Sequence, residues 1–108
     1  MIKPEDVQVL QELSKVSNLA FKHEVTHYLY FRKKNNAATT VRELKKAGFE
    51  VESNLSADRS TWLVLAKHQI GPTEEAIADA VIRMEELAEK HTGQYDGWEA
   101  GVVPKQPV

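Results

Sequence analysis

The sequence predicts an α+β domain in which four strands form one antiparallel sheet, two helices cover one face of it, and a further helix precedes the sheet. The first observation is length, because 108 residues fit one domain and leave no room for a second. The second is a hydrophobic content of 42%, which is typical of a globular chain. The third is the order of helical and strand-like periodicities along the chain.

The N-terminal segment, residues 4–17, predicts an amphipathic helix. Pro4 suits the first helical position, and the acidic residues after it favour the positive end of the helix dipole. Apolar residues then recur at helical spacing. Residues 23–31 predict a strand, because β-branched and aromatic side chains gather there without Gly or Pro. The far end of this strand is apolar on both sides, so we expect a central strand that is covered on both faces.

A second helix is expected to follow, with Asn35 or Asn36 as its N-cap. Gly48 is expected to end it in the left-handed conformation, and Lys45 and Lys46 precede it near the negative end of the dipole.

A hairpin is expected next. Residues 49–53 alternate between apolar and polar side chains, which predicts a half-exposed strand. Residues 61–66 form an uninterrupted apolar run, which predicts a buried strand. The polar residues 54–60 connect the two.

The third helix has the clearest start in the chain, with Thr73 as N-cap and two glutamates in the first turn. Gly93 is expected to end it. Residues 94–100 predict a last strand, in which Gly97 indicates a bulge or a close approach of the backbone. Residues 103–108 predict a frayed tail.

The predicted order is a helix and then β-α-β-β-α-β over residues 23–100, which is the split βαβ pattern of the ferredoxin-like fold. Residues 1–108 are therefore expected to form one domain.

Composition and motifs exclude several kinds of chemistry. With no cysteine there is no disulfide, zinc finger or thiol nucleophile. The scattered glycines form no phosphate-binding loop. His23 and His27 share one face of a predicted strand but lie roughly 13 Å apart, too far to bind one metal ion. We therefore expect that the protein is not an enzyme and that it binds neither a metal ion nor a cofactor.

Location is predicted from the same composition. No apolar run approaches the roughly 20 residues of a membrane span. The first residues turn acidic too soon for a signal peptide. The expectation is a small cytoplasmic protein.

The net charge of −2 conceals a strong asymmetry. Residues 32–48 carry six basic side chains and one acidic one, whereas residues 73–100 carry two basic and eight acidic ones. Such a distribution can steer a charged partner.

Direct RNA binding is one alternative, because the same fold carries an RNA-recognition module. The basic segment 32–46 could contact phosphate. Tyr28, Tyr30 and Trp62 could stack on bases if they face outward. We expect them instead to lie in the core or beneath the N-terminal helix. A small-ligand or dimerisation module is a further alternative.

Two stretches of the chain form a recognisable combination. One is residues 27–31, His-Tyr-Leu-Tyr-Phe, followed by a helix that leads into residues 47–51, Ala-Gly-Phe-Glu-Val. The other is residues 93–99, Gly-Gln-Tyr-Asp-Gly-Trp-Glu. Together they resemble the RraB family, the regulators of ribonuclease activity B. The positions taken as the family signature are Tyr28, Tyr30, Tyr95, Asp96, Gly97 and Trp98.

The resemblance implies a small, cytoplasmic bacterial protein that acts by binding rather than by catalysis. Members of known function bind the endoribonuclease RNase E and modulate RNA decay, so RNase E or another RNA-decay component is the expected partner. A homodimer is also considered. We expect the partner to contact the acidic helix and the last strand, through Glu85, Glu86, Glu89, Asp96, Trp98 and Glu99.

Overall fold

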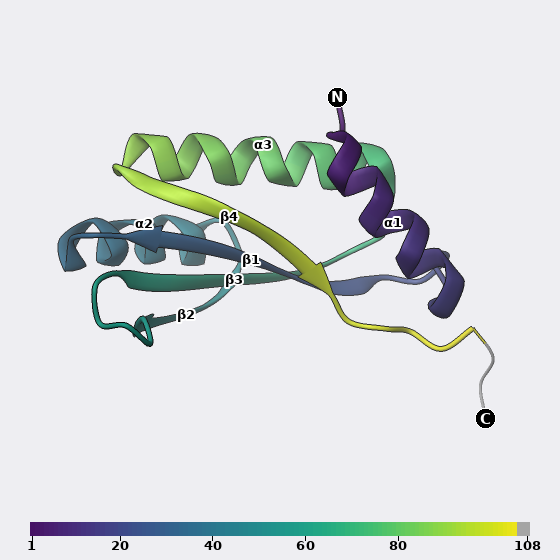
Figure 1. Cartoon of the computed structure of the whole chain (residues 1–108), viewed down its shortest axis with the longest axis horizontal. Coiled ribbons are helices and arrows are strands. Elements are labelled where there is room, and N and C mark those ends of the chain that lie inside the picture. The colour runs from purple at the N-terminus through teal and green to yellow at the C-terminus, as the bar shows by residue number, and fades with distance from the viewer. Residues whose placement is uncertain (106–108) are drawn as a thin grey trace.

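The computed structural model describes residues 1–105 of the chain. Three helices and four strands follow one another in the predicted order (Figure 1). Their bounds are α1 Pro4–Val16, β1 His23–Phe31, α2 Lys34–Lys46, β2 Glu50–Leu55, β3 Trp62–Ile70, α3 Glu74–Lys90 and β4 Gly93–Ala100.

One sheet contains all four strands, in the order β2-β3-β1-β4. All three pairings are antiparallel. The predicted hairpin is confirmed, since β2 pairs with β3 along its whole length. The helices α2 and α3 lie on the same face of the sheet, which confirms the α+β fold predicted from the element order (Figure 1).

The core lies between the sheet and these two helices. Alternate β1 residues point into it, from His23 to Phe31, and each of these side chains is at most 1% exposed. A larger cluster joins Leu29 and Phe31 to Leu44 of α2 and Met84 of α3.

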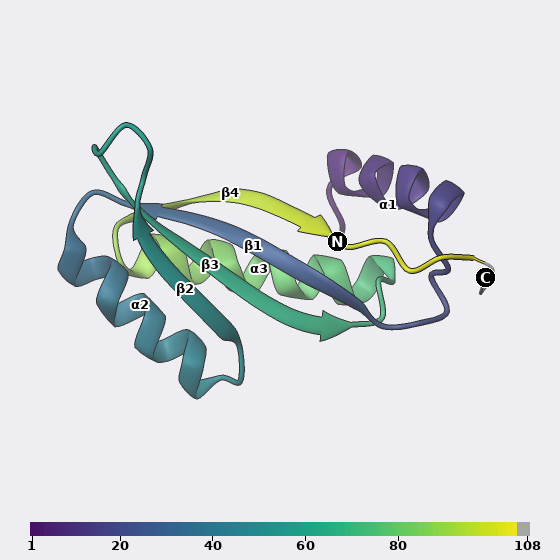
Figure 2. The same cartoon turned by 90° about the horizontal axis from the view of Figure 1, so that it is seen from below.

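A smaller core cluster attaches α1 to the rest of the fold. Leu10 of α1 packs with Val25, Ile77 and Val81, so α1 extends the helical layer beside α3. Figure 2 looks onto the opposite face of the sheet, where the strands lie in front of α3 and no helix lies in front of the strands. The expectation that β1 is covered on both faces is therefore wrong, because α1 docks at the end of α3 instead.

The predicted helix ends at Gly48 and Thr73 are confirmed, whereas those at Asn35 or Asn36 and at Gly93 are wrong. The helix α3 ends at Lys90, and Thr92, with φ of +58°, takes the left-handed conformation before Gly93 begins β4. Gly48 has φ of +98°. The N–H of Gly48 donates a hydrogen bond to the carbonyl of Lys45, and the N–H of Phe49 donates one to the carbonyl of Leu44, which together form a Schellman motif. The Thr73 hydroxyl accepts a hydrogen bond from the Ala76 backbone, as a helix cap should.

Neither Asn35 nor Asn36 caps α2, because that helix begins at Lys34 after Lys33, whose side chain makes no capping bond. The chain turns at once after the buried Phe31, and the early start brings Ala37 into the core at 2% exposure.

The hairpin strands are longer than predicted, to Leu55 and to Ile70. The extra residues are mostly polar. Pairing between β2 and β3 holds Leu55 opposite Trp62, and pairing with β1 holds the end of β3 up to Ile70, which lies opposite His23. Their polar composition predicted a loop rather than a strand. A sheet with one uncovered face accommodates polar side chains, so composition does not mark where these strands end.

A bulge interrupts the pairing of β4 with β1. Tyr28 lies opposite Gly97, but the next residue, Leu29, lies opposite Tyr95, so Asp96 is the extra residue. Gly97 has φ of +109°, which confirms the predicted bulge. The close backbone approach occurs at Gly93 instead, which lies against the ring of Phe31.

The segment after β4 is held at Val103. Its carbonyl accepts hydrogen bonds from the Asn18 backbone and the Ser17 hydroxyl, and its N–H donates to that hydroxyl. The predicted fraying is therefore wrong at Val103, because the start of the tail closes over buried Ser17. The remainder of the predicted tail, residues 106–108, lies outside the described residues. Within residues 1–105, no helix is long and apolar enough to cross a membrane.

Candidate functional site

The six residues expected to contact a partner lie on three different surfaces. Glu86 and Glu89 are exposed on α3, away from the sheet. Glu85, Asp96 and Trp98 lie beside α1. The sixth, Glu99, lies on the uncovered face of the sheet, where it accepts a hydrogen bond from Tyr28. These residues do not form one continuous patch.

The surface beside α1 is engaged in contacts within the molecule. The indole Nε1 of Trp98 donates to the carboxylate of Asp6 over 2.9 Å. Glu85 forms an ion pair with Lys3, which precedes α1. Trp98 and Glu85 therefore attach α1 to β4 and α3. Asp96 remains exposed on the bulge, at the edge of a shallow hollow between these elements.

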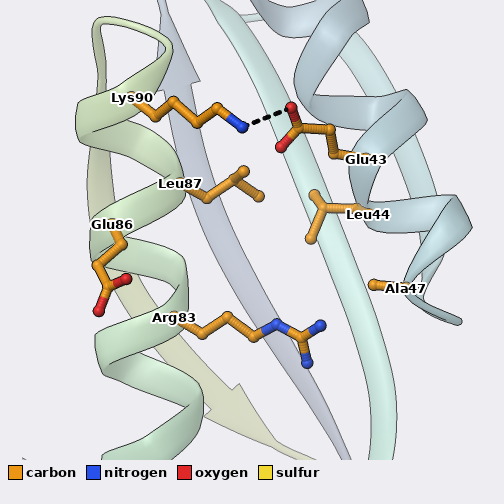
Figure 3. A pocket seen from close by; sticks show the side chains of 7 residues that line it. All are labelled: Glu43, Leu44, Ala47, Arg83, Glu86, Leu87 and Lys90. Carbon is orange, nitrogen blue, oxygen red and sulfur yellow. Dashed lines mark hydrogen bonds and ion pairs between the residues drawn. The ribbon is translucent and has the colours of Figure 1, made fainter.

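A groove runs between α2 and α3 (Figure 3). Leu44 and Leu87 point toward each other across it, and the carboxylate of Glu43 accepts a hydrogen bond of 3.1 Å from Lys90. The Lys90 contact is the main cause that lowers the pKa of Glu43. His91 Nε2 lies 3.1 Å from the same carboxylate. The polar side chains at this end of the groove therefore neutralise one another.

The structure brings together two histidines that lie 41 positions apart in the sequence. The Nε2 atoms of His27 and His68 lie 3.0 Å apart, and His27 Nδ1 is 2.9 Å from the Tyr95 hydroxyl. His27 is fully buried. Burial, and then the neighbouring His68, lower the pKa of His27 to about 3. Burial, and then the charge of Arg83, also lower the pKa of His68.

This histidine pair was missed because its partners depend on strand register. Val25 lies opposite His68 and His27 opposite Ala66, so the two imidazoles meet diagonally across neighbouring strands. Both ring nitrogens of His27 are occupied by protein groups, and its ring is closed to solvent. In residues 1–105, no group of three or more metal-binding side chains is arranged to hold a metal ion. The pair is thus a polar contact inside the core.

The basic segment divides into two clusters at opposite ends of α2. Residues 32–34 lie at the start of the helix, and Arg42, Lys45 and Lys46 lie toward its end. The helix has 13 residues, which separates its ends by roughly 18 Å. Lys34 lies over the ring of Trp62, 5.3 Å from its centre. The segment therefore does not form one continuous phosphate-binding surface.

The aromatic residues considered for base stacking lie on opposite faces. Tyr28 and Tyr30 alternate with the buried residues of β1, so they point to the uncovered face and are half-buried. Trp62 lies opposite Phe31 and shares the core face. The expectation that all three are internal is wrong for the two tyrosines, because α1 does not cover them.

The signature positions are likewise divided between the faces. Tyr95 and Trp98 pack against the core beneath the helices, whereas Tyr28 and Tyr30 are on the uncovered face. Asp96 and Gly97 form the bulge between Tyr95 and Trp98.

The family model described as "RraB: Regulator of ribonuclease activity B" matches residues 3–100, which include every helix and strand of the fold. No curated protein matches the chain.

Proposed function

Because the chain belongs to the RraB family of regulators of ribonuclease activity, we propose that it is a non-catalytic protein that binds a component of the RNA-decay machinery. The endoribonuclease RNase E is the first partner to test. The observation that carries the proposal is the extent of the match, from the start of α1 to the end of β4.

A binding role agrees with how the titratable groups are used. His27 is fully buried and in contact with His68 and Tyr95. General acid–base catalysis needs a group within reach of a substrate proton. His27 has no such access, so it supports the fold rather than chemistry.

The charge distribution favours a basic protein partner. On α3, four exposed carboxylates recur at intervals that place them along one stripe of the helix: Glu75, Asp79, Glu86 and Glu89. The uncovered sheet face adds further carboxylates, among them Glu50 and Glu99. Ribonuclease regions that bind RNA are basic, because they must neutralise phosphates. Partner contact through Glu86 and Glu89 stays a prediction, and contact through the uncovered sheet face competes with it.

The test is binding and inhibition with purified components. RNase E is immobilised, the chain is titrated over it, and cleavage of a labelled RNA is followed in parallel. We expect saturable binding and slower cleavage that recovers when the chain is diluted. If the chain at high concentration neither binds RNase E nor slows cleavage, RNase E is not the partner. An unrelated protein of similar size and the same net charge serves as the control for non-specific adhesion.

The RNA-binding alternative is separated in the same experiment. Labelled RNA alone is titrated with the chain at low salt and again at physiological salt. Direct binding through the segment 32–46 would give an affinity that falls steeply as salt rises. We expect no such complex, because the two basic clusters are separated by the length of α2. Light scattering of the free chain tests the dimer.

A further inference from the structure

The face of the sheet opposite the helices is left without a covering layer (Figure 2). At its centre, Tyr28 lies opposite Leu65 and Tyr30 opposite Leu63, on the neighbouring strands β1 and β3. These four side chains, which we call the apolar strip, are only half-buried. Beside Tyr28, Gly97 of β4 has no side chain, so the strip is open toward that strand.

Four carboxylates, which we call the carboxylate rim, lie at and beyond one end of the apolar strip, the end formed by Tyr28 and Leu65. Glu50 and Glu52 lie on β2, Glu24 lies at the start of β1 and Glu99 lies on β4, and all four are exposed. At the other end, uncharged Asn54 and Gln94 lie opposite Leu63 and Tyr30. Within the four strands, Lys67 is the one basic residue on this face, and it lies 3.0 Å from Glu52. Four acidic side chains against one basic side chain give this face a clear negative charge.

The Tyr28 ring is held in place by the rim. Its hydroxyl donates to Glu99, and that bond is the main cause that raises the pKa of Tyr28 to about 12. The hydroxyl therefore remains protonated at neutral pH. Tyr28 is half-buried on this face, and aromatic rings attract arginine and lysine side chains.

We propose that the apolar strip and its carboxylate rim bind an Arg/Lys-rich segment of the protein partner, with apolar side chains of that segment on the strip and its basic side chains on the rim. This inference rests on the proposed function, since it takes the partner to be a protein. The exposed carboxylates of α3 are a weaker candidate for this surface. Ile82 is the single large apolar side chain exposed on that helix, so a partner's apolar residues would have little to pack against.

Charge decides between the other occupants of this face. A nucleic acid would bring phosphates against four carboxylates. A second copy that docked by the same face would bring the two acidic rims together, since a two-fold dimer pairs a surface with itself. A basic protein segment meets neither repulsion, and electrostatic complementarity of this kind speeds association and selects the partner.

The experiment compares two triple variants that each remove three negative charges. The sheet variant is E50Q/E52Q/E99Q, and the matched helix variant is E75Q/E86Q/E89Q. The probe is a synthetic peptide in which arginine alternates with leucine and phenylalanine, and a second peptide carries glutamate in place of arginine. Binding is measured by titration, and amide resonances of the ¹⁵N-labelled chain show where the peptide lies. Thermal unfolding confirms that each variant is folded.

We expect the basic peptide to shift the amides of β1 and β3. The sheet variant should weaken binding about ten-fold, as three exposed ion pairs would, and the helix variant by less than about two-fold. Tyr30→Ala should also weaken it, whereas Tyr28→Phe, which keeps the ring, should not. Equal binding of the acidic peptide, amide shifts confined to α3, or a larger effect of the helix variant would each overturn the proposal.

The same variants separate this inference from the proposed function. If RNase E binds and the sheet variant binds it as the wild type does, the docking surface is wrong and the regulator stands. If RNase E does not bind but the basic peptide still lies on the strip, RNase E is the wrong partner and the surface stands.

Discussion

The indole nitrogen of Trp98 donates a hydrogen bond to the carboxylate of Asp6, which joins the last strand to the first helix over 2.9 Å. Asp6 is 9% exposed, so water competes little for this contact. The bond explains why a tryptophan follows the bulge in β4: its ring packs in the smaller core cluster while its one donor reaches α1.

Removing this bond should loosen α1. In Asp6→Ala, the Trp98 N–H loses its acceptor in a partly buried position, and we expect a loss of about 1–3 kcal/mol in the free energy of unfolding. Urea unfolding followed by tryptophan fluorescence measures it. Asp6→Asn keeps an oxygen acceptor and should lose less. Gln8→Ala, at an exposed position of the same helix, should change stability by less than about 0.5 kcal/mol. An Asp6→Ala protein as stable as the wild type would contradict the anchoring role.

Acid should destabilise the protein through His27. Its pKa is about 3 in the folded chain, against 6.5 for an ordinary imidazole. Between these values the unfolded chain binds a proton that the folded chain does not. Stability is therefore fully present above about pH 6.5 and falls as the pH drops, by up to about 1.4 kcal/mol per pH unit from this residue. The lowered pKa of His68 acts in the same direction.

Guanidinium unfolding at about pH 5 and about pH 8 checks this expectation, because high salt reduces the contribution of surface charges. His27→Gln should be less stable than the wild type at the higher pH and should show a flatter dependence on pH. The same slope in both proteins would show that His27 does not cause the loss.

Two glycines in β4 should resist substitution for different reasons. A Cβ at Gly93 would lie 2.3 Å from the Phe31 ring and 2.8 Å from the Tyr30 carbonyl oxygen, so Gly93→Ala should cost about 1–3 kcal/mol. Gly97→Ala meets no atom within 4 Å, but its φ of +109° is strained for alanine, at roughly 1 kcal/mol or more.

Gly101→Ala is the matched control, because it has open space and no positive φ. We expect it to change stability by less than about 0.5 kcal/mol. Thermal unfolding of the three variants gives the order of their stabilities directly. If Gly93→Ala were as stable as Gly101→Ala, the close approach to Phe31 would be wrong.

Ser17 should be important for the packing of the segment after β4. Its hydroxyl lies 2.6 Å from His23 Nε2 and is hydrogen-bonded to both backbone groups of Val103. Ser17→Ala leaves these groups without their partner, and we expect a loss of about 1–3 kcal/mol. Hydrogen exchange should become faster at Val103. Ser14→Ala, whose hydroxyl bonds within its own helix, should change neither quantity by much.

Much of the fold could be predicted because the signals are local. The spacing of apolar residues predicts α1 and α3, and the glycine at position 48 and the threonine at position 73 correctly mark two helix ends. Gly97 indicates the bulge in the same way. Each of these signals depends on residues that are near one another in the chain, so no knowledge of the sheet is needed.

The candidate sites were less predictable. The acidic residues that were expected to form one surface lie on three surfaces. Glu85 forms an ion pair with Lys3, Glu99 accepts a hydrogen bond from Tyr28, and the other acidic residues are exposed to solvent. Whether two exposed carboxylates share a surface depends on how α3 and β4 are placed, and composition carries no such information.

The sequence by itself determined the order and kind of the elements, the family and the asymmetry of charge. The tertiary structure alone decided that α1 packs beside α3, which leaves Tyr28 and Tyr30 uncovered, and that His27 meets His68. The physical reason is that periodicity and capping are short-range properties of the chain. Strand register and the docking of a helix arise from contacts between residues that are far apart in the sequence, such as Asp6 and Trp98.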